Sequence, residues 1–98
     1  MVTFAFKEIG ENLVTRPLGA KAREQLLSLI QSNDRVVLDF TGVNVVSNSF
    51  ADECIAKLLL AMPLQELKQR TTFQGLNPVA ADSVLTALQR RHLSMAEA

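Results

Sequence analysis

A cluster of short polar side chains follows the apolar block Val36–Phe40 in the middle of this 98-residue chain. The block is too continuous for a half-exposed strand and predicts the centre of a parallel sheet covered on both faces. Open α/β sheets present ligands and partners at the carboxyl ends of such strands, so we expect function in the segment that follows. The polar residues at the end of the strand and in this segment are Asp39, Thr41, Ser47, Asn48 and Ser49.

These residue types support little catalytic chemistry. A nucleophilic Ser or Cys needs a nearby base, and the only histidine, His92, lies near the far end of the chain. Cys54 falls on an inward helical stripe and is interpreted as a core residue. Asp52 and Glu53 are adjacent on a helix, where their side chains diverge by about 100 degrees and cannot form the facing pair of a hydrolase. The spacing of metal ligands, a Gly-rich phosphate loop and a dinucleotide fingerprint are all missing, so we expect no enzyme, metal or cofactor.

Composition narrows the class further. Ten basic residues balance ten acidic ones, so the chain has no strong positive field for nucleic acid or anionic lipid. A single cysteine excludes an intrachain disulfide, and the first residues, MVTFAFKEIG, have no signal-peptide pattern, which makes the cytoplasm the default location. The longest apolar run, residues 58–64, is far shorter than the roughly 20 residues of a membrane-spanning helix. We expect one domain, residues 1–98, that binds neither nucleic acid nor membrane.

Alternating patterns predict a small α/β domain in the order strand, helix, strand, helix, strand, helix. Residues 13–15 either fold back as an antiparallel hairpin partner of the first strand or lead directly into the first helix. We predict a mostly parallel sheet of three to four strands with helices mainly on one face, and a frayed tail at residues 94–98. The strands are expected at residues 2–9, 35–41 and 71–76, and the helices at 17–31, from Phe50 to the residue before Pro63, and from Pro78 to about Arg91.

The start of the second predicted helix combines several stabilising features. Ser49, followed three residues later by Asp52, approximates a capping box, so Ser49 is expected to be the N-cap. Glu53 and Lys57 form a favourable i, i+4 pair, and we place them with Asp52 on an exposed flank of the helix. A helix start can also hold a phosphoryl group, which the two carboxylates would repel, so a phosphate here would be a switchable charge.

The run LDFTGVNVVSNSF, residues 38–50, resembles the signature stretch of STAS domains, the fold of bacterial anti-sigma factor antagonists. In those proteins a strand ending LDLS leads to an Asp-Ser-Ser-Gly turn and a helix. With Arg16 ahead of the first helix and SFADE at residues 49–53, the chain is most similar to a STAS-like family of unassigned function that is often associated with histidine-kinase-type ATPase domains. In the antagonists, a partner kinase of this ATPase superfamily phosphorylates a serine of the turn and the partner is released. The resemblance implies a STAS-like fold and a regulatory role in bacterial signalling.

Carried over by position, the Asp of that turn falls on Ser47, its two serines on Asn48 and Ser49, and its glycine on Phe50. The usual phosphoacceptor position is therefore Asn48, which has no hydroxyl, and Ser47 and Ser49 are the candidate phosphorylation sites. Asp39 matches the antagonist Asp at the end of the strand, where we expect it to hydrogen-bond backbone amides of the following loop.

We predict a non-enzymatic regulatory module that docks on a protein partner such as a histidine-kinase-type ATPase. Leu60, Met62 and Leu64 could add an apolar rim to the docking surface, close the core or form a homodimer. The residues expected to bind the partner are Asp39, Thr41, Asn48, Phe50, Asp52, Glu53 and Lys57.

Two alternatives come from other functional classes. A small-molecule or nucleotide sensor would use the start of the second helix, at Asn48 to Phe50, as an anion site. A hydrolase or transferase acting through Asp39 with Ser47 or Ser49 is weaker still, because no base is evident.

Overall fold

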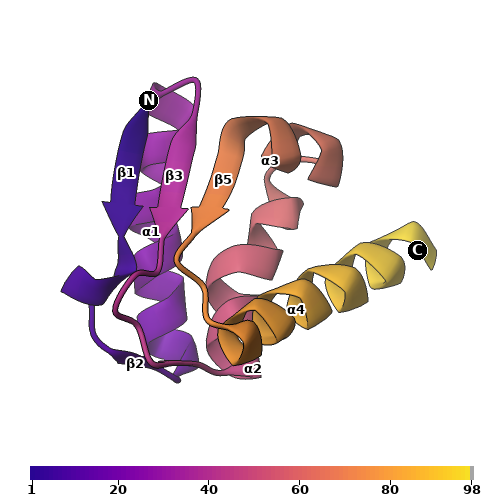
Figure 1. Cartoon of the computed structure of the whole chain (residues 1–98). Coiled ribbons are helices and arrows are strands. Elements are labelled where there is room, and N and C mark those ends of the chain that lie inside the picture. Colours follow the sequence, from indigo (N-terminus) through magenta and orange to yellow (C-terminus); the bar gives the residue numbers. More distant parts are fainter. Residues whose placement is uncertain (98) are drawn as a thin grey trace.

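The fold is described by a computed structural model that covers residues 1–97. The strand and helix alternation of a small α/β domain is confirmed (Figure 1). Segments α2, η2 and η3 follow one another without a break, and we call residues 48–60 the second helix; η2 is a π turn, and η1 and η3 are 3-10 helices. In chain order the elements are β1 (Val2–Ala5), η1 (Phe6–Glu8), β2 (Asn12–Leu13), α1 (Arg16–Ser32), β3 (Val36–Asp39), β4 (Val45–Val46), α2 (Asn48–Phe50), η2 (Ala51–Ile55), η3 (Ala56–Leu60), α3 (Leu64–Arg70), β5 (Thr71–Gln74) and α4 (Pro78–Glu97).

The main sheet has three parallel strands in the order β1-β3-β5. Its register aligns Phe4, Leu38 and Phe73, whose side chains point to the face that is covered by helices. On the other face Val37 is only partly buried and Thr72 is exposed. The expectation that the central strand is covered on both faces is therefore wrong. One apolar side chain on the open face is enough to make a four-residue strand look continuously buried.

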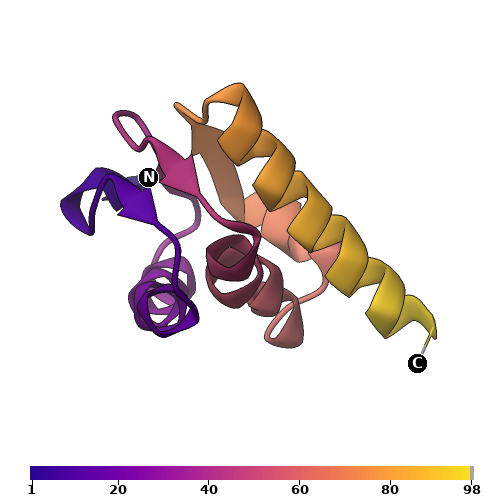
Figure 2. The same ribbon diagram turned by 90° about the horizontal axis from the view of Figure 1, so that it is seen from below.

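Two helices cover the inner face of the sheet, as predicted. Figure 2 shows α1 and the second helix side by side beneath the strands, and α4 lies against the second helix from the other side. The second helix is therefore enclosed by α1, by the sheet and by α4. Within residues 1–97, no helix is both long enough and apolar enough to cross a membrane.

Three phenylalanines form the centre of the core. Phe6, Phe40 and Phe50 are fully buried; the rings of Phe6 and Phe40 stack with centroids 4.0 Å apart, and Phe50 meets Phe6 edge-on at 6.4 Å. Phe6 reaches this position because the chain leaves the first strand after Ala5 and turns through η1. The first strand is consequently shorter than the predicted 2–9.

Residues 13–15 do not form an antiparallel hairpin with the first strand, which was one of the two predicted alternatives. Segment β2 pairs in parallel with β4, not with β1. The Ser47 N–H donates to the Leu13 carbonyl over 2.9 Å, and the Asn44 N–H donates to the Glu11 carbonyl over 2.8 Å. The η1 turn has already carried the chain away from β1, so residues 12–13 meet the loop that precedes the second helix. This pairing fixes the start of the second helix against the start of α1.

The remaining boundaries differ from the prediction mainly near the C-terminus. Helix α1 and strand β3 lie where the patterns placed them, but α3 (Leu64–Arg70) was not anticipated, because Pro63 ends one helix and precedes another. Helix α4 continues past the expected end near Arg91 to Glu97. Fraying of residues 94–98 stays a prediction, and residue 98 lies outside the described residues.

Candidate functional site

The second helix begins at a different serine from the one expected. Ser47 is its N-cap: the Ser47 Oγ accepts a 3.0 Å hydrogen bond from the Phe50 N–H and donates a 2.8 Å bond to the Val14 carbonyl. The prediction that Ser49 is the cap is wrong, because the β2-β4 pairing starts the helix two residues earlier. Ser49 instead lies in the first turn, with its side chain exposed.

A polar hollow lies beside this helix start. Its volume is about 380 Å³, and it is bounded by the first turn of the second helix, the first residue of α1 and the part of α4 that carries Thr86 and Arg90. The hollow brings the predicted residues Asn48 and Ser49 together with side chains from α1 and α4. Its lining residues are Arg16, Asn48, Ser49, Asp52, Thr86, Ala87 and Arg90.

Asp39 organises the loop after β3, as predicted. Its Oδ1 accepts hydrogen bonds from the Thr41 N–H over 3.0 Å and from the Thr41 hydroxyl over 2.6 Å. These bonds from Thr41 lower the pKa of the Asp39 carboxyl. Gly75 has a φ of +76°, and a Cβ there would lie 2.3 Å from the Thr41 Oγ1, so the two loops pack closely. Within the described residues, no hydrogen bond links this turn to Ser49.

Asp52 is paired with arginines from two helices. Arg91 of α4 donates to its carboxylate through Nε over 3.0 Å and through Nη2 over 2.9 Å, and Arg16 of α1 donates over 2.9 Å. The Arg91 hydrogen bonds are the largest cause of the lowered pKa of Asp52, and Arg16 adds to it. Asp52 therefore holds α1 and α4 to the second helix.

Glu53 is buried and carries three cationic partners. The Glu53 carboxylate accepts hydrogen bonds from Arg23 over 2.9 Å, from Lys57 over 3.0 Å and from Arg16 over 3.2 Å. Arg23 also donates to the backbone carbonyl of Glu53. These bonds, that of Arg23 above all, hold the pKa of Glu53 at about 2, below its ordinary value of 4.5. The prediction of an exposed acidic flank is wrong for Glu53, because α1 covers that side of the helix.

A close approach of two helices makes this pairing possible. Arg16, Gly19 and Arg23 recur at i, i+3 and i+7, so they lie on one face of α1. A Cβ at Gly19 would lie only 3.0 Å from the Cβ of Glu53, and glycine is what lets α1 and the π turn come this near. Arg23 is not among the residues that the sequence predicted for this site. The i, i+3, i+7 spacing of two arginines about a glycine was the signal that could have identified the pairing.

Phe50 cannot contact a partner in this fold. Its side chain is fully buried against Phe6. The prediction that Phe50 binds a partner is therefore wrong. Lys57 is partly buried and is paired with Glu53. Of the predicted apolar rim, Met62 is buried and Leu60 is 65% exposed.

The thiol of Cys54, next to Glu53 in the chain, is buried and not activated as a nucleophile. Burial raises the pKa of the Cys54 thiol to about 12, so the thiolate is scarce at neutral pH. Among residues 1–97, no group of three or more His, Cys, Asp or Glu side chains is placed to hold a metal ion. The chemistry of the hollow is therefore that of charge and hydrogen bonding.

Comparison with family models places the chain in a described family. The model of a family described as a STAS-like domain of unknown function (DUF4325) matches residues 19–80, well over half of the chain. The match confirms the resemblance seen in residues 38–50. It includes Ser49 and Glu53, whereas Arg16 and Arg90 lie outside it. No match was found among curated proteins or among solved structures.

Proposed function

The chain belongs to this family of STAS-like domains of unknown function, and we propose that it is a non-enzymatic regulatory module that docks on a protein partner. The observation that carries the proposal is the polar hollow at the start of the second helix. Asn48 and Ser49 are exposed there beside Arg16 and Arg90. A surface with paired charges, hydrogen-bonding groups and no nucleophile–base pair suits recognition of a protein better than turnover of a substrate.

The proposed docking surface contains fewer residues than the sequence analysis predicted. Thr41, Asn48 and Ser49 are exposed and can meet a partner directly. Asp52 and Glu53 instead support the surface from below, because they hold α1 and α4 in place. Substitution of either acid would alter the fold as well as any docking.

The resemblance to anti-sigma factor antagonists suggests the partner and its control. We propose a histidine-kinase-type ATPase as the partner and Ser49 as the residue that it phosphorylates, in bacterial signalling in the cytoplasm. Ser49 is favoured over Ser47 because the Ser47 hydroxyl is engaged as cap and as donor to Val14. A phosphate on Ser49 would lie in a hollow that two arginines line, and arginine forms strong charge-assisted hydrogen bonds with phosphate.

Site-specific photocrosslinking in the source cell tests the docking surface. A photoreactive amino acid at Asn48 should give one dominant covalent adduct with a protein that carries an ATPase domain of this type. The matched control is the same amino acid at Gln31, which is also exposed and lies at the far end of α1. Equal adducts from both positions, or none from Asn48, would refute docking through this surface. A dominant adduct with a protein of another class would refute the ATPase partner alone.

Phosphorylation is tested with the captured partner and ATP. Intact-mass analysis should show one added phosphate on the wild-type chain and on Ser47→Ala, and none on Ser49→Ala. Retention of the phosphate by Ser49→Ala would exclude this serine as the acceptor. Release of the partner should accompany the modification, and binding that does not change on phosphorylation would contradict the proposed control.

A sensor of small anions is the second candidate, and the arginines of the hollow favour it. Arg16 and Arg90 could bind a phosphorylated metabolite, but the Asp52 carboxylate lines the same hollow and opposes a second negative charge. Titration with inorganic phosphate and with ATP in a thermal-unfolding assay separates the two candidates. Saturable stabilisation without any protein partner would favour the sensor.

A further inference from the structure

The outer edge of β1 has no strand beside it in the described chain. The Val2 N–H donates to the Arg35 carbonyl over 3.2 Å, and β1 pairs in parallel with β3 from Val2 to Ala5. In a parallel sheet the N–H and C=O groups of one residue point to the strand on one side, and those of the next residue point to the opposite side. Val2 and Phe4 therefore face β3, and the N–H and C=O groups of Thr3 and Ala5 face away from the sheet.

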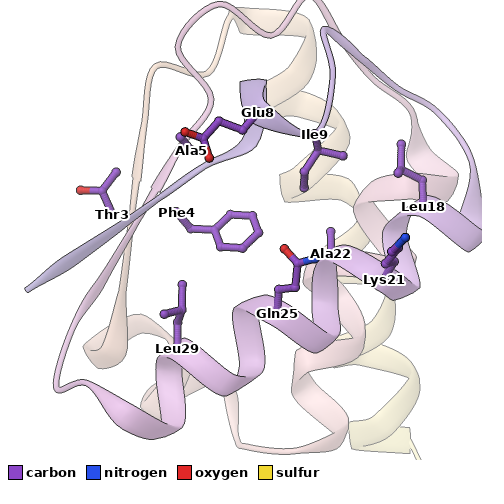
Figure 3. Close-up of a pocket in the computed structure, with 10 residues that line it drawn as sticks. All are labelled: Thr3, Phe4, Ala5, Glu8, Ile9, Leu18, Lys21, Ala22, Gln25 and Leu29. Atoms are coloured by element: carbon purple, nitrogen blue, oxygen red, sulfur yellow. The ribbon is translucent and has the colours of Figure 1, made fainter.

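A groove runs beside this edge, between β1 and α1. Its volume is about 570 Å³. Figure 3 shows Phe4 pointing into the space between the strand and the helix, with Ala22, Gln25 and Leu29 rising from α1 below it and Ile9 closing one end. An added strand at this edge would place every second side chain over the groove, where Phe4, Ala22 and Leu29 lie beside the polar Gln25.

The charges of the groove favour a neutral occupant. Among its lining residues only Glu8 and Lys21 are charged, one of each sign. Two copies of this surface therefore do not repel each other, whereas a strongly acidic or basic peptide finds no complement. The strand itself, VTFA, contains none of the charges or prolines that commonly protect a sheet edge from pairing.

We propose that a second copy of this chain pairs with β1 through this edge, in antiparallel orientation about a two-fold axis. Thr3 and Ala5 each offer one outward donor and one outward acceptor, so the edge is complementary to itself. The pairing would join two three-stranded sheets into one of six strands. Figure 2 shows α1 directly beneath β1, so the same axis brings the two α1 helices together and covers both grooves. This interface lies away from the hollow at Ser49 and does not depend on the proposed docking function.

The short length of β1 limits the contact. The chain leaves the strand at Phe6 and forms η1, so pairing can involve only Ala5 and the residues before it. Two strands this short need the burial of apolar side chains in addition to hydrogen bonds to stay paired. Leu18 and Leu29 of the groove provide this burial. We therefore expect a dissociation constant in the micromolar range, not the nanomolar range of a large obligate interface.

Sedimentation of the full chain tests the proposal. The wild type should sediment as a dimer at about 100 μM, well above a micromolar dissociation constant, and as a monomer after dilution. Ala5→Pro removes one outward donor, and Ala5 has an extended backbone with a negative φ of −88°, from which proline needs only a small adjustment, so the monomer should fold. This variant should sediment as a monomer at both concentrations, whereas the control Ala5→Ser keeps the donor and should dimerise like the wild type.

Amide hydrogen exchange gives a readout that needs no variant. The Thr3 and Ala5 amides should exchange slowly at high protein concentration and faster on dilution, while the Phe4 amide stays protected in both. A wild type that is monomeric at high concentration would overturn the proposal, even if another protein occupies the groove. A dimer that persists in Ala5→Pro would place the interface elsewhere and overturn the proposal. Thr3 and Ala5 amides of the wild type that exchange at the same rate at both concentrations would do so as well.

Discussion

Replacing Glu53 by Gln should destabilise the protein, because the buried carboxylate joins α1 to the second helix. Its side chain is 9% exposed and has Arg16, Arg23 and Lys57 as partners. The depression of its pKa from 4.5 to about 2 corresponds to about 3 kcal/mol of stability at neutral pH. Since Arg16 is half exposed and Arg23 and Lys57 are about a quarter exposed, solvent screening reduces this contribution. We expect a loss of about 2 kcal/mol.

The pH dependence follows from the sign of the pKa shift. A carboxyl group whose pKa is lower in the folded state stabilises the fold above its unfolded pKa and loses this contribution as the pH falls through the folded one. The stability gap between the wild type and Glu53→Gln should therefore be full above pH 4.5 and close as the pH falls toward about 2. Asp52, whose pKa is also lowered, is present in both proteins and does not create the gap.

Urea unfolding measures the difference in unfolding free energy between the wild type and Glu53→Gln. Far-UV circular dichroism follows the unfolding, because the chain has no Trp or Tyr for fluorescence. The melting temperature of Glu53→Gln should fall by roughly 10 °C at neutral pH. Glu24→Gln is the matched control, because Glu24 is exposed on α1 and should change stability by less than about 0.5 kcal/mol. Equal stability of Glu53→Gln and wild type, or a gap that does not change between neutral and acidic pH, would refute the assigned role of this carboxylate.

Three further predictions test the local structure. Ser47→Ala should cost about 1 kcal/mol in chemical denaturation through loss of the N-cap, whereas Ser49→Ala should cost less than about 0.5 kcal/mol; the reverse order would return the cap to Ser49. Gly75→Ala should cost about 2 kcal/mol or more, because alanine is strained at a φ of +76° and its methyl group would strike Thr41, and a neutral effect on the melting temperature would contradict this packing. Cys54 should resist thiol reagents in the native protein at about pH 8 and react rapidly in urea, and rapid labelling of the native protein would contradict its burial.

The hydrophobic periodicity of the sequence predicted the positions of the helices and strands better than it predicted which of their side chains are buried. The spacing of Ala22, Leu26 and Ile30 placed α1 correctly, because one helix face buries those residues and the sequence records it. The same reasoning failed for Glu53. Five of the six residues in 51–56 are buried, which a helix with one apolar face cannot achieve, and a π turn enclosed from several sides can.

The missing information was which helices lie on either side of the second helix, since α1 covers Glu53 and α4 pairs with Asp52. A pattern along one helix indicates that the helix has a buried side but does not say how many neighbours it has. Arg91, near which the last helix was predicted to end, donates two hydrogen bonds to Asp52. Contacts of this kind join residues that are far apart in the sequence. A local pattern does not record them, so it indicates exposed acidic residues where the fold pairs them with arginines.

The position of Arg16 connects the stability of the fold with the proposed switch. Arg16 lines the hollow beside Ser49 and also donates to both Asp52 and Glu53. A phosphate on Ser49 would compete with these carboxylates for the same guanidinium, since arginine binds both groups through the same donors. Under the proposed function, phosphorylation would therefore add charge to the docking surface and also weaken the contact between α1 and the second helix. Removal of that arginine should reduce any phosphate-dependent change in stability, whereas the loss of Arg91, which contacts Asp52 from α4, should leave it in place.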